Sequence, residues 1–63
     1  MNKIKLLRNK KNMTQQQLSR KSGVSQAYIN ELENGKKSNP SFKVVARLAR
    51  ALEVPVKDLF DSF

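Results

Sequence analysis

Residues 14–35, TQQQLSRKSGVSQAYINELENG, contain the local signals that decide the fold. Thr14 is followed three residues later by Gln17, and this spacing forms a capping box, which predicts that a helix begins here. Gly23 can adopt the left-handed conformation that closes a helix, so we expect this helix to end at Ser22.

A second short helix is expected directly after the glycine. Ser25 can cap its first turn, and Gly35 supplies its stop. Two helices joined by about three residues that include a glycine match the helix-turn-helix motif, whose second helix enters the DNA major groove. The apolar inner surface of this motif is predicted to consist of Leu18, Val24, Ile29 and Leu32.

The outward-facing side chains of the motif are short and mostly polar. Such side chains suit base edges, because glutamine can pair with adenine through two hydrogen bonds and a methyl group can contact the thymine methyl. The outward set is Gln15, Gln26, Ala27, Asn30 and Glu31.

The charge of the chain is strongly positive and unevenly distributed. Thirteen Lys and Arg residues stand against five Asp and Glu residues, a net charge of +8 over 63 residues. Residues 1–50 carry twelve of the cations and two of the acids, whereas residues 51–63 carry one cation and three acids. The first thirty residues contain no acid, so the field over the motif should attract a polyanion, and duplex DNA is the natural candidate.

The composition argues against several classes of protein. The chain contains no cysteine and no histidine, so we expect no metal, cofactor or small-molecule ligand and no enzymatic activity. No apolar run exceeds the three residues 44–46, so neither a membrane span nor a signal-peptide core is expected. We therefore expect a cytoplasmic, nucleoid-associated protein in which residues 1–63 form one DNA-binding domain.

Helical periodicity dominates the chain and no segment alternates like a strand, so an all-α fold of five helices is expected. The first helix should cover about residues 2–11, and residues 36–40 should form a loop after the motif. Ser41 can cap a fourth helix, and Pro55 opens a short fifth helix. The apolar stripe of the fourth helix is Val45, Leu48, Ala49 and Leu52, with Phe42 packing at its entrance.

The fifth helix carries one apolar stripe that the other helices can cover only in part. Leu59 should face the core, which leaves Val56, Phe60 and Phe63 as a predicted interface between two copies of the chain. In the alternative, Phe60 completes the core of the monomer and Phe63 frays.

Taken in order, these motifs resemble the lambda repressor-like helix-turn-helix family, which includes phage repressors, Cro proteins and many small bacterial regulators. The resemblance covers nearly the whole chain and implies a compact five-helix DNA-binding domain whose second and third helices form the motif. It is carried by Leu7-Arg8, Thr14-Gln15, Leu18-Ser19, Gly23-Val24-Ser25, Ile29 through Leu32-Glu33-Asn34-Gly35, Asn39-Pro40-Ser41, and Leu52-Glu53-Val54 through Leu59-Phe60.

The resemblance also implies roles for residues that face DNA. Gln26, the first residue of the recognition helix, would read adenine, braced by Gln15, which would also hold a phosphate. The outward positions Ala27, Asn30 and Glu31 match those that set sequence choice in the family.

Contacts to the DNA backbone are implied for Asn34, Lys36 and Lys37, which match the turn and loop contacts of the family. Two roles stay open for Tyr28. Its hydroxyl would lie against the sugar-phosphate backbone, or its ring would shield Ile29.

Arg8, Glu33 and Glu31 are charged residues that each admit two roles. By charge alone Arg8 and Glu33 resemble DNA contacts, but family members carry a partly buried ion pair at these positions, and we favour that structural role. Glu31 would accept a hydrogen bond from a cytosine amino group, or it would turn sideways toward a Lys or Arg of the motif.

The leading functional hypothesis is a sequence-specific transcriptional regulator that binds double-stranded DNA. It would act as a homodimer on an inverted-repeat operator, most simply as a repressor that occupies a promoter. The alternative is an antitoxin-like or partner-binding module in which protein interaction is the main role. RNA binding and membrane adsorption have less support, because only Tyr28 is a candidate stacking platform and the apolar face of the first helix is narrow.

Overall fold

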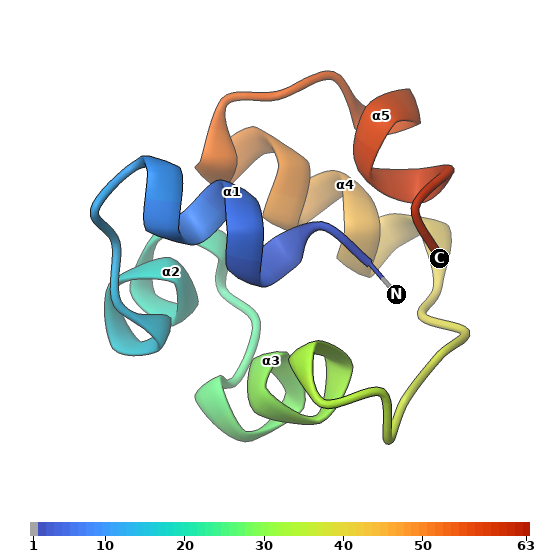
Figure 1. Cartoon of the computed structure of the whole chain (residues 1–63), viewed down its shortest axis with the longest axis horizontal. Coiled ribbons are helices and arrows are strands. Elements are labelled where there is room, and N and C mark those ends of the chain that lie inside the picture. Colours follow the sequence, from blue (N-terminus) through green and yellow to red (C-terminus); the bar gives the residue numbers. More distant parts are fainter. Residues whose placement is uncertain (1) are drawn as a thin grey trace.

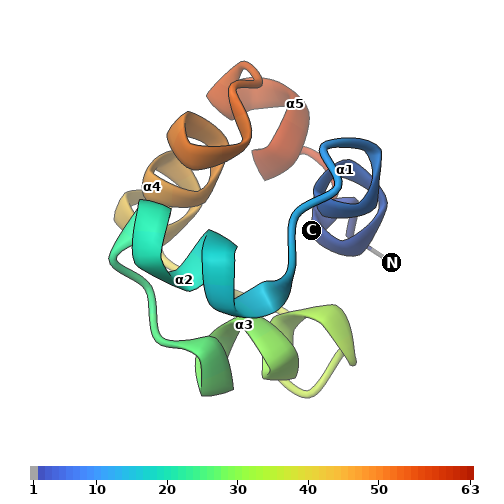
Figure 2. The same cartoon turned by 90° about the vertical axis from the view of Figure 1, so that its left-hand side faces the viewer.

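The computed structural model describes residues 2–63, and these residues form five helices and no strand (Figure 1). The prediction of an all-α fold with five helices is confirmed. In Figure 2 the helices surround a common interior. Their bounds are α1 (Ile4–Lys10), α2 (Gln15–Ser22), α3 (Gln26–Glu33), α4 (Phe42–Leu52) and α5 (Val56–Phe60).

The local signals of the motif form the structures they predict. The Thr14 hydroxyl accepts a hydrogen bond from the Gln17 N–H at 3.1 Å, and the Gln17 side-chain oxygen accepts one from the Thr14 N–H at 2.9 Å. Gly23 closes α2 with φ +75°, and the Ser25 hydroxyl accepts from the Tyr28 N–H at 3.1 Å. The capping box, the left-handed glycine and the serine cap of α3 are therefore confirmed.

The first helix is shorter than the predicted span of residues 2–11. It begins at Ile4 because the Asn2 side chain lies outside the helix and connects two elements. Its oxygen accepts from the Ile4 N–H at 3.1 Å, and its amide nitrogen donates to the Leu32 carbonyl near the end of α3 at 2.7 Å. A contact between residues thirty positions apart cannot be read from local sequence.

The core is built around α4, which packs against both α2 and α5. Ser41 caps this helix by accepting a hydrogen bond from the Val44 N–H at 3.2 Å. All four predicted stripe residues are fully buried, and every helix contributes to the same cluster. The buried apolar residues are Ile4, Leu18, Val24, Ile29, Leu32, Val45, Leu48, Ala49, Ala51, Leu52 and Leu59.

Two predictions for aromatic residues need correction. Phe42 lies at the entrance of α4 as expected, but it packs on Phe60 and not into the core. It is 63% exposed, and its ring meets the edge of Phe60 with centroids 5.7 Å apart. Neither reading of the fifth helix holds in full: Phe60 remains 44% exposed, against the alternative, whereas Phe63, which we expected in the exposed interface, is half-buried against the core.

The end of α4 contains a strained residue that the sequence did not indicate. Glu53 has φ +59°, a left-handed conformation usually occupied by glycine, and the turn is closed by a hydrogen bond from the Val54 N–H to the Ala49 carbonyl at 3.0 Å. For a residue with a Cβ this conformation costs about 1–2 kcal/mol. Asn12 has φ +53°, but asparagine tolerates this region better than glutamate.

We predict that Glu53→Gly raises the free energy of unfolding by about 1 kcal/mol, because the strain at φ +59° is removed. The substitution also removes the 3.5 Å ion pair with Lys11, but both side chains are exposed, so this loss is small. Urea unfolding followed by circular dichroism measures the change. Asn12→Gly is the matched control and should give a smaller gain. A less stable Glu53→Gly variant would contradict the prediction.

Candidate nucleic-acid interface

The start of α2 and the outer side of α3 together line one shallow, open hollow. Its α3 residues are exposed apart from the half-buried Glu31, and its α2 residue is also half-buried. The hollow contains the whole outward-facing set expected from the sequence. Its lining residues are Gln15, Gln26, Ala27, Asn30 and Glu31.

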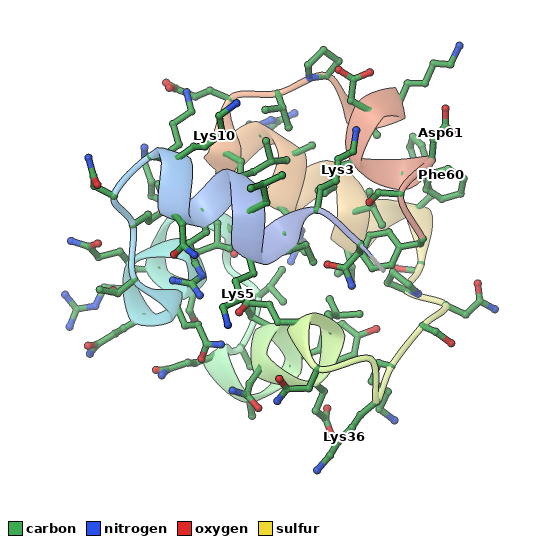
Figure 3. All side chains as sticks on the ribbon, viewed as in Figure 1. Lys3, Lys5, Lys10, Lys36, Phe60 and Asp61 are labelled. Carbon is green, nitrogen blue, oxygen red and sulfur yellow. The ribbon has the colours of Figure 1, made fainter. Side chains whose placement is uncertain are left out.

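Lysines flank α3 from two directions (Figure 3). Lys5 points from α1 toward α3, and Lys36 extends from the loop that follows α3. Lys3 and Lys10 lie on the opposite side of α1 and point away from α3. The lysines of α1 are thus not equivalent as candidate phosphate contacts.

Arg8 and Glu33 form an ion pair with two parallel hydrogen bonds. Arg8 Nε donates to Glu33 Oε2 at 2.8 Å, and Arg8 Nη2 donates to Glu33 Oε1 at 3.0 Å. The side chains are only 12% and 3% exposed. Arg8 Nη1 also donates to the Met13 carbonyl at 2.9 Å. The pair therefore joins α1, the connection between α1 and α2, and the end of α3, as the favoured structural role requires.

The ionised form of Glu33 is favoured in the folded chain. Burial alone would raise the pKa of Glu33, but hydrogen bonds from Arg8 and Gln15 and the charges of Arg8 and Lys5 outweigh burial and lower it. The hydrogen bond to Glu33 in turn raises the pKa of Arg8. Because the pKa of Glu33 is lower in the folded than in the unfolded chain, its contribution to stability is present above the unfolded value and is lost as the pH falls through the folded value.

Gln15 does not brace Gln26 as expected. Its Nε2 donates to Glu33 Oε1 at 3.1 Å, and its Oε1 accepts from Asn30 Nδ2 at 3.4 Å. A buried carboxylate is a stronger acceptor than a neutral amide, which explains why the Gln15 amide turns toward Glu33. Asn34 Nδ2 in turn donates to Asn30 Oδ1 at 2.9 Å.

The sequence leaves two roles open for Glu31 and two for Tyr28, and the neighbours of each residue in the fold bear on the choice. Within residues 2–63, Glu31 forms no ion pair, so the sideways contact with a Lys or Arg is not present. Tyr28 is half-buried and packs against the core cluster that contains Ile29, which fits the shielding role. The contact between the Tyr28 hydroxyl and the DNA backbone stays a prediction.

Sequence reasoning missed two features near this site. One is the tether from Asn2 to the end of α3, for which the local sequence holds no signal. The other is the hydrogen bond between Asn30 and Asn34. Asn34 directly follows the last residue of α3, and the spacing of four residues places the two side chains side by side, so this contact could have been predicted.

Comparisons with known proteins agree with the geometry of α2 and α3. Residues 4–59 match a family model described as helix-turn-helix. The chain belongs to the helix-turn-helix family. It is of the Cro/C1 type, the kind of DNA-binding domain found in transcriptional regulators, and α2 and α3 form its helix-turn-helix. Within residues 2–63, none of the helices is long and apolar enough to cross a membrane, and no group of acidic residues could hold a metal ion.

Several relatives carry the same domain. The HTH-type transcriptional regulator SlrR of Bacillus subtilis is 37% identical over 59 residues, which cover 94% of this chain and 39% of SlrR. The HTH-type transcriptional repressor RghR of the same organism is 39% identical over 56 residues, 89% of this chain and 42% of RghR. The chain thus spans about two fifths of the length of these two proteins. An uncharacterized HTH-type regulator of Archaeoglobus fulgidus is 41% identical over 58 residues, 92% of this chain and 80% of that protein.

We predict that Arg8→Ala or Glu33→Ala lowers the free energy of unfolding by about 3–5 kcal/mol, because each leaves a buried charge without its partner. Thermal and urea unfolding measure the loss. The double variant Arg8→Met with Glu33→Leu is the control, and it should recover much of the stability because no unpaired charge remains. Unchanged melting of Arg8→Ala together with weaker DNA binding would instead make Arg8 a phosphate contact.

Proposed function

We propose that this helix-turn-helix domain binds double-stranded DNA in a sequence-specific manner and serves a transcriptional regulator, most simply a repressor that occupies a promoter. The observation that carries the proposal is the hollow on α3, which presents amide and methyl groups of the kind that contact base edges. The names of SlrR and RghR support the regulatory role, and that of RghR supports repression.

The electrostatics around the hollow favour a polyanion. Glu33 lies next to the hollow, but its carboxylate is held by Arg8 and buried, so it repels phosphates little. Lys5 and Lys36 flank α3, and Lys37 and Asn34 are exposed beside Lys36. Positive groups on both sides of a reading surface that carries a single acid, Glu31, match the arrangement of backbone contacts around base contacts.

Within the hollow, Gln26 is the residue best placed to discriminate between bases. It is exposed at the first position of α3, and within residues 2–63 its side-chain amide makes no hydrogen bond to the protein. A free amide can pair with adenine through two hydrogen bonds. Ala27 and Glu31 line the same surface and would contact neighbouring base pairs. Tyr28 would contact the DNA backbone through its hydroxyl, while its side chain packs against the core.

The domain would bind DNA as a homodimer. Phe60 is 44% exposed and its ring meets that of the exposed Phe42 edge-on, so the two rings form an apolar patch, to which the half-buried Val56 and Phe63 would add. This patch lies at the end of the chain that carries most of the acids, where a second copy meets little repulsion. A two-fold contact there would place the two α3 helices about 34–36 Å apart and require an inverted repeat.

We predict salt-sensitive binding to duplex DNA. For about four to six neutralised phosphates per dimer, log affinity should fall against log salt concentration with a slope of about −4 to −5. Fluorescence anisotropy with a labelled duplex at several salt concentrations measures it. Lys36→Ala should make the slope shallower, whereas Lys10→Ala, which removes a lysine that points away from α3, should not. A slope near zero for the unmodified chain would refute DNA binding.

We predict that Gln26→Ala weakens binding to the preferred duplex by about 1–3 kcal/mol and relaxes the preference at one adenine per half-site. Lys36→Ala should weaken all duplexes alike, because a phosphate contact carries no sequence information. Competition binding with duplexes that differ at single base pairs distinguishes the two variants. Equal losses on preferred and unrelated duplexes for both variants would show that Gln26 does not read a base.

We predict that Phe60→Ser gives a folded monomer with weakened operator binding, because it removes the centre of the aromatic patch. Sedimentation velocity, with and without DNA, measures association. Leu6→Ser is the matched control, since Leu6 is a 60% exposed apolar residue on α1, outside the patch, and its loss should leave association unchanged. Unaltered association of Phe60→Ser would exclude this interface.

A further inference from the structure

We propose that Asn30 is a positioning residue that orients Gln15 and Asn34 toward DNA phosphates, and not one of the residues that select the base sequence. The inference rests on the proposed function and assigns Asn30 a different role from its neighbours in the hollow. It follows from a row of side-chain hydrogen bonds that runs from Asn34 through Asn30 and Gln15 to Glu33.

The direction of this row is fixed at one end by the ionised Glu33. A carboxylate can only accept hydrogen bonds, so Gln15 must present its NH₂ group to it, as the 3.1 Å contact shows. The Gln15 oxygen then faces Asn30 and accepts from its NH₂ group at 3.4 Å, the longest link of the row. The Asn30 oxygen is left to accept from Asn34 at 2.9 Å.

This arrangement engages both ends of the Asn30 amide. Reading adenine requires an amide that presents an N–H and an oxygen together to one base edge, and in Asn30 both groups are already turned toward Gln15 and Asn34. Gln26 differs, because within residues 2–63 no side chain or backbone group hydrogen-bonds its amide. The two residues lie one turn apart on α3 and line the same hollow, but of these two only Gln26 has an amide without a partner among residues 2–63.

The groups that remain free in the row suit phosphate oxygens. Each amide nitrogen carries two hydrogens and uses one of them within the row, so Gln15, Asn30 and Asn34 each retain one donor. The oxygens of Gln15 and Asn30 already accept a hydrogen bond. Phosphate oxygens only accept, so a set of side chains rich in free donors matches the DNA backbone better than the mixed pattern of base edges.

A double-mutant cycle tests this role. Asn30→Ala, Gln15→Ala and the double variant are compared on the preferred duplex and on every single-base-pair variant of one half-site. We expect Asn30→Ala to weaken binding about threefold to tenfold on all duplexes alike, in line with the loss of a positioning hydrogen bond. The fold-loss in DNA affinity of the double variant should be smaller than the product of the fold-losses of the two single variants, because part of the effect of Asn30 passes through Gln15.

Two further measurements make the test decisive. The matched control combines Gln26→Ala with Asn30→Ala. Here the fold-losses in DNA affinity of the single variants should multiply, because no hydrogen bond joins these residues. Circular dichroism melting should be unchanged for Asn30→Ala, whose side chain is exposed.

The inference is overturned if Asn30→Ala removes the preference at one base pair. It is also overturned if the fold-loss in DNA affinity of the double variant equals the product of the fold-losses of Asn30→Ala and Gln15→Ala. An unmodified protein that binds duplexes without any sequence preference would refute the proposed function itself, and this inference with it. The two failures are distinguishable because the second is visible before any variant is made.

Discussion

The buried ion pair between Arg8 and Glu33 is the constraint on which the arrangement of the site depends. Its two hydrogen bonds and the bond from Arg8 to the Met13 carbonyl hold α1, the connection between α1 and α2, and the end of α3 together. Such a pair is costly to bury and tolerates poor geometry badly, so it restricts these helices to one relative placement. The orientation of α3 is therefore set by contacts within the protein.

The same pair also neutralises a negative charge close to the surface proposed to bind DNA. A DNA-binding surface needs positive charge, yet the end of α3 carries a glutamate. Arg8 neutralises this glutamate in the interior, and the lowered pKa of Glu33 keeps it ionised and able to accept a further hydrogen bond. Gln15 takes that hydrogen bond, and through Gln15 the influence of the ion pair reaches the surface of α3.

The features that could be predicted from the sequence depend on residues close together in the chain. The capping box of Thr14 and Gln17, the left-handed Gly23 and the stripe of α4 each arise within one or two helical turns. The outward set of α2 and α3 follows from the same periodicity, so the hollow was also predictable. The partners of Arg8 and Glu33 were expected only because the chain resembles a family that pairs them.

The remaining features require the folded chain. The start of α1 is delayed to Ile4 because the Asn2 side chain reaches the end of α3, thirty residues away. Gln15 turns to Glu33 because a buried carboxylate lies nearby, and neither its burial nor its distance is visible in the sequence. Glu53 adopts a left-handed conformation that its residue type disfavours, because the packing of α4 and α5 requires a turn there.

Selection of bound sites from a pool of random duplexes tests the central claim, that α3 reads DNA sequence, most directly. The account predicts enrichment of one inverted repeat with half-site centres about 10–10.5 base pairs apart and an adenine at an equivalent position in each half. A pool that stays random after several rounds, although the protein is folded and binds DNA, would contradict the claim.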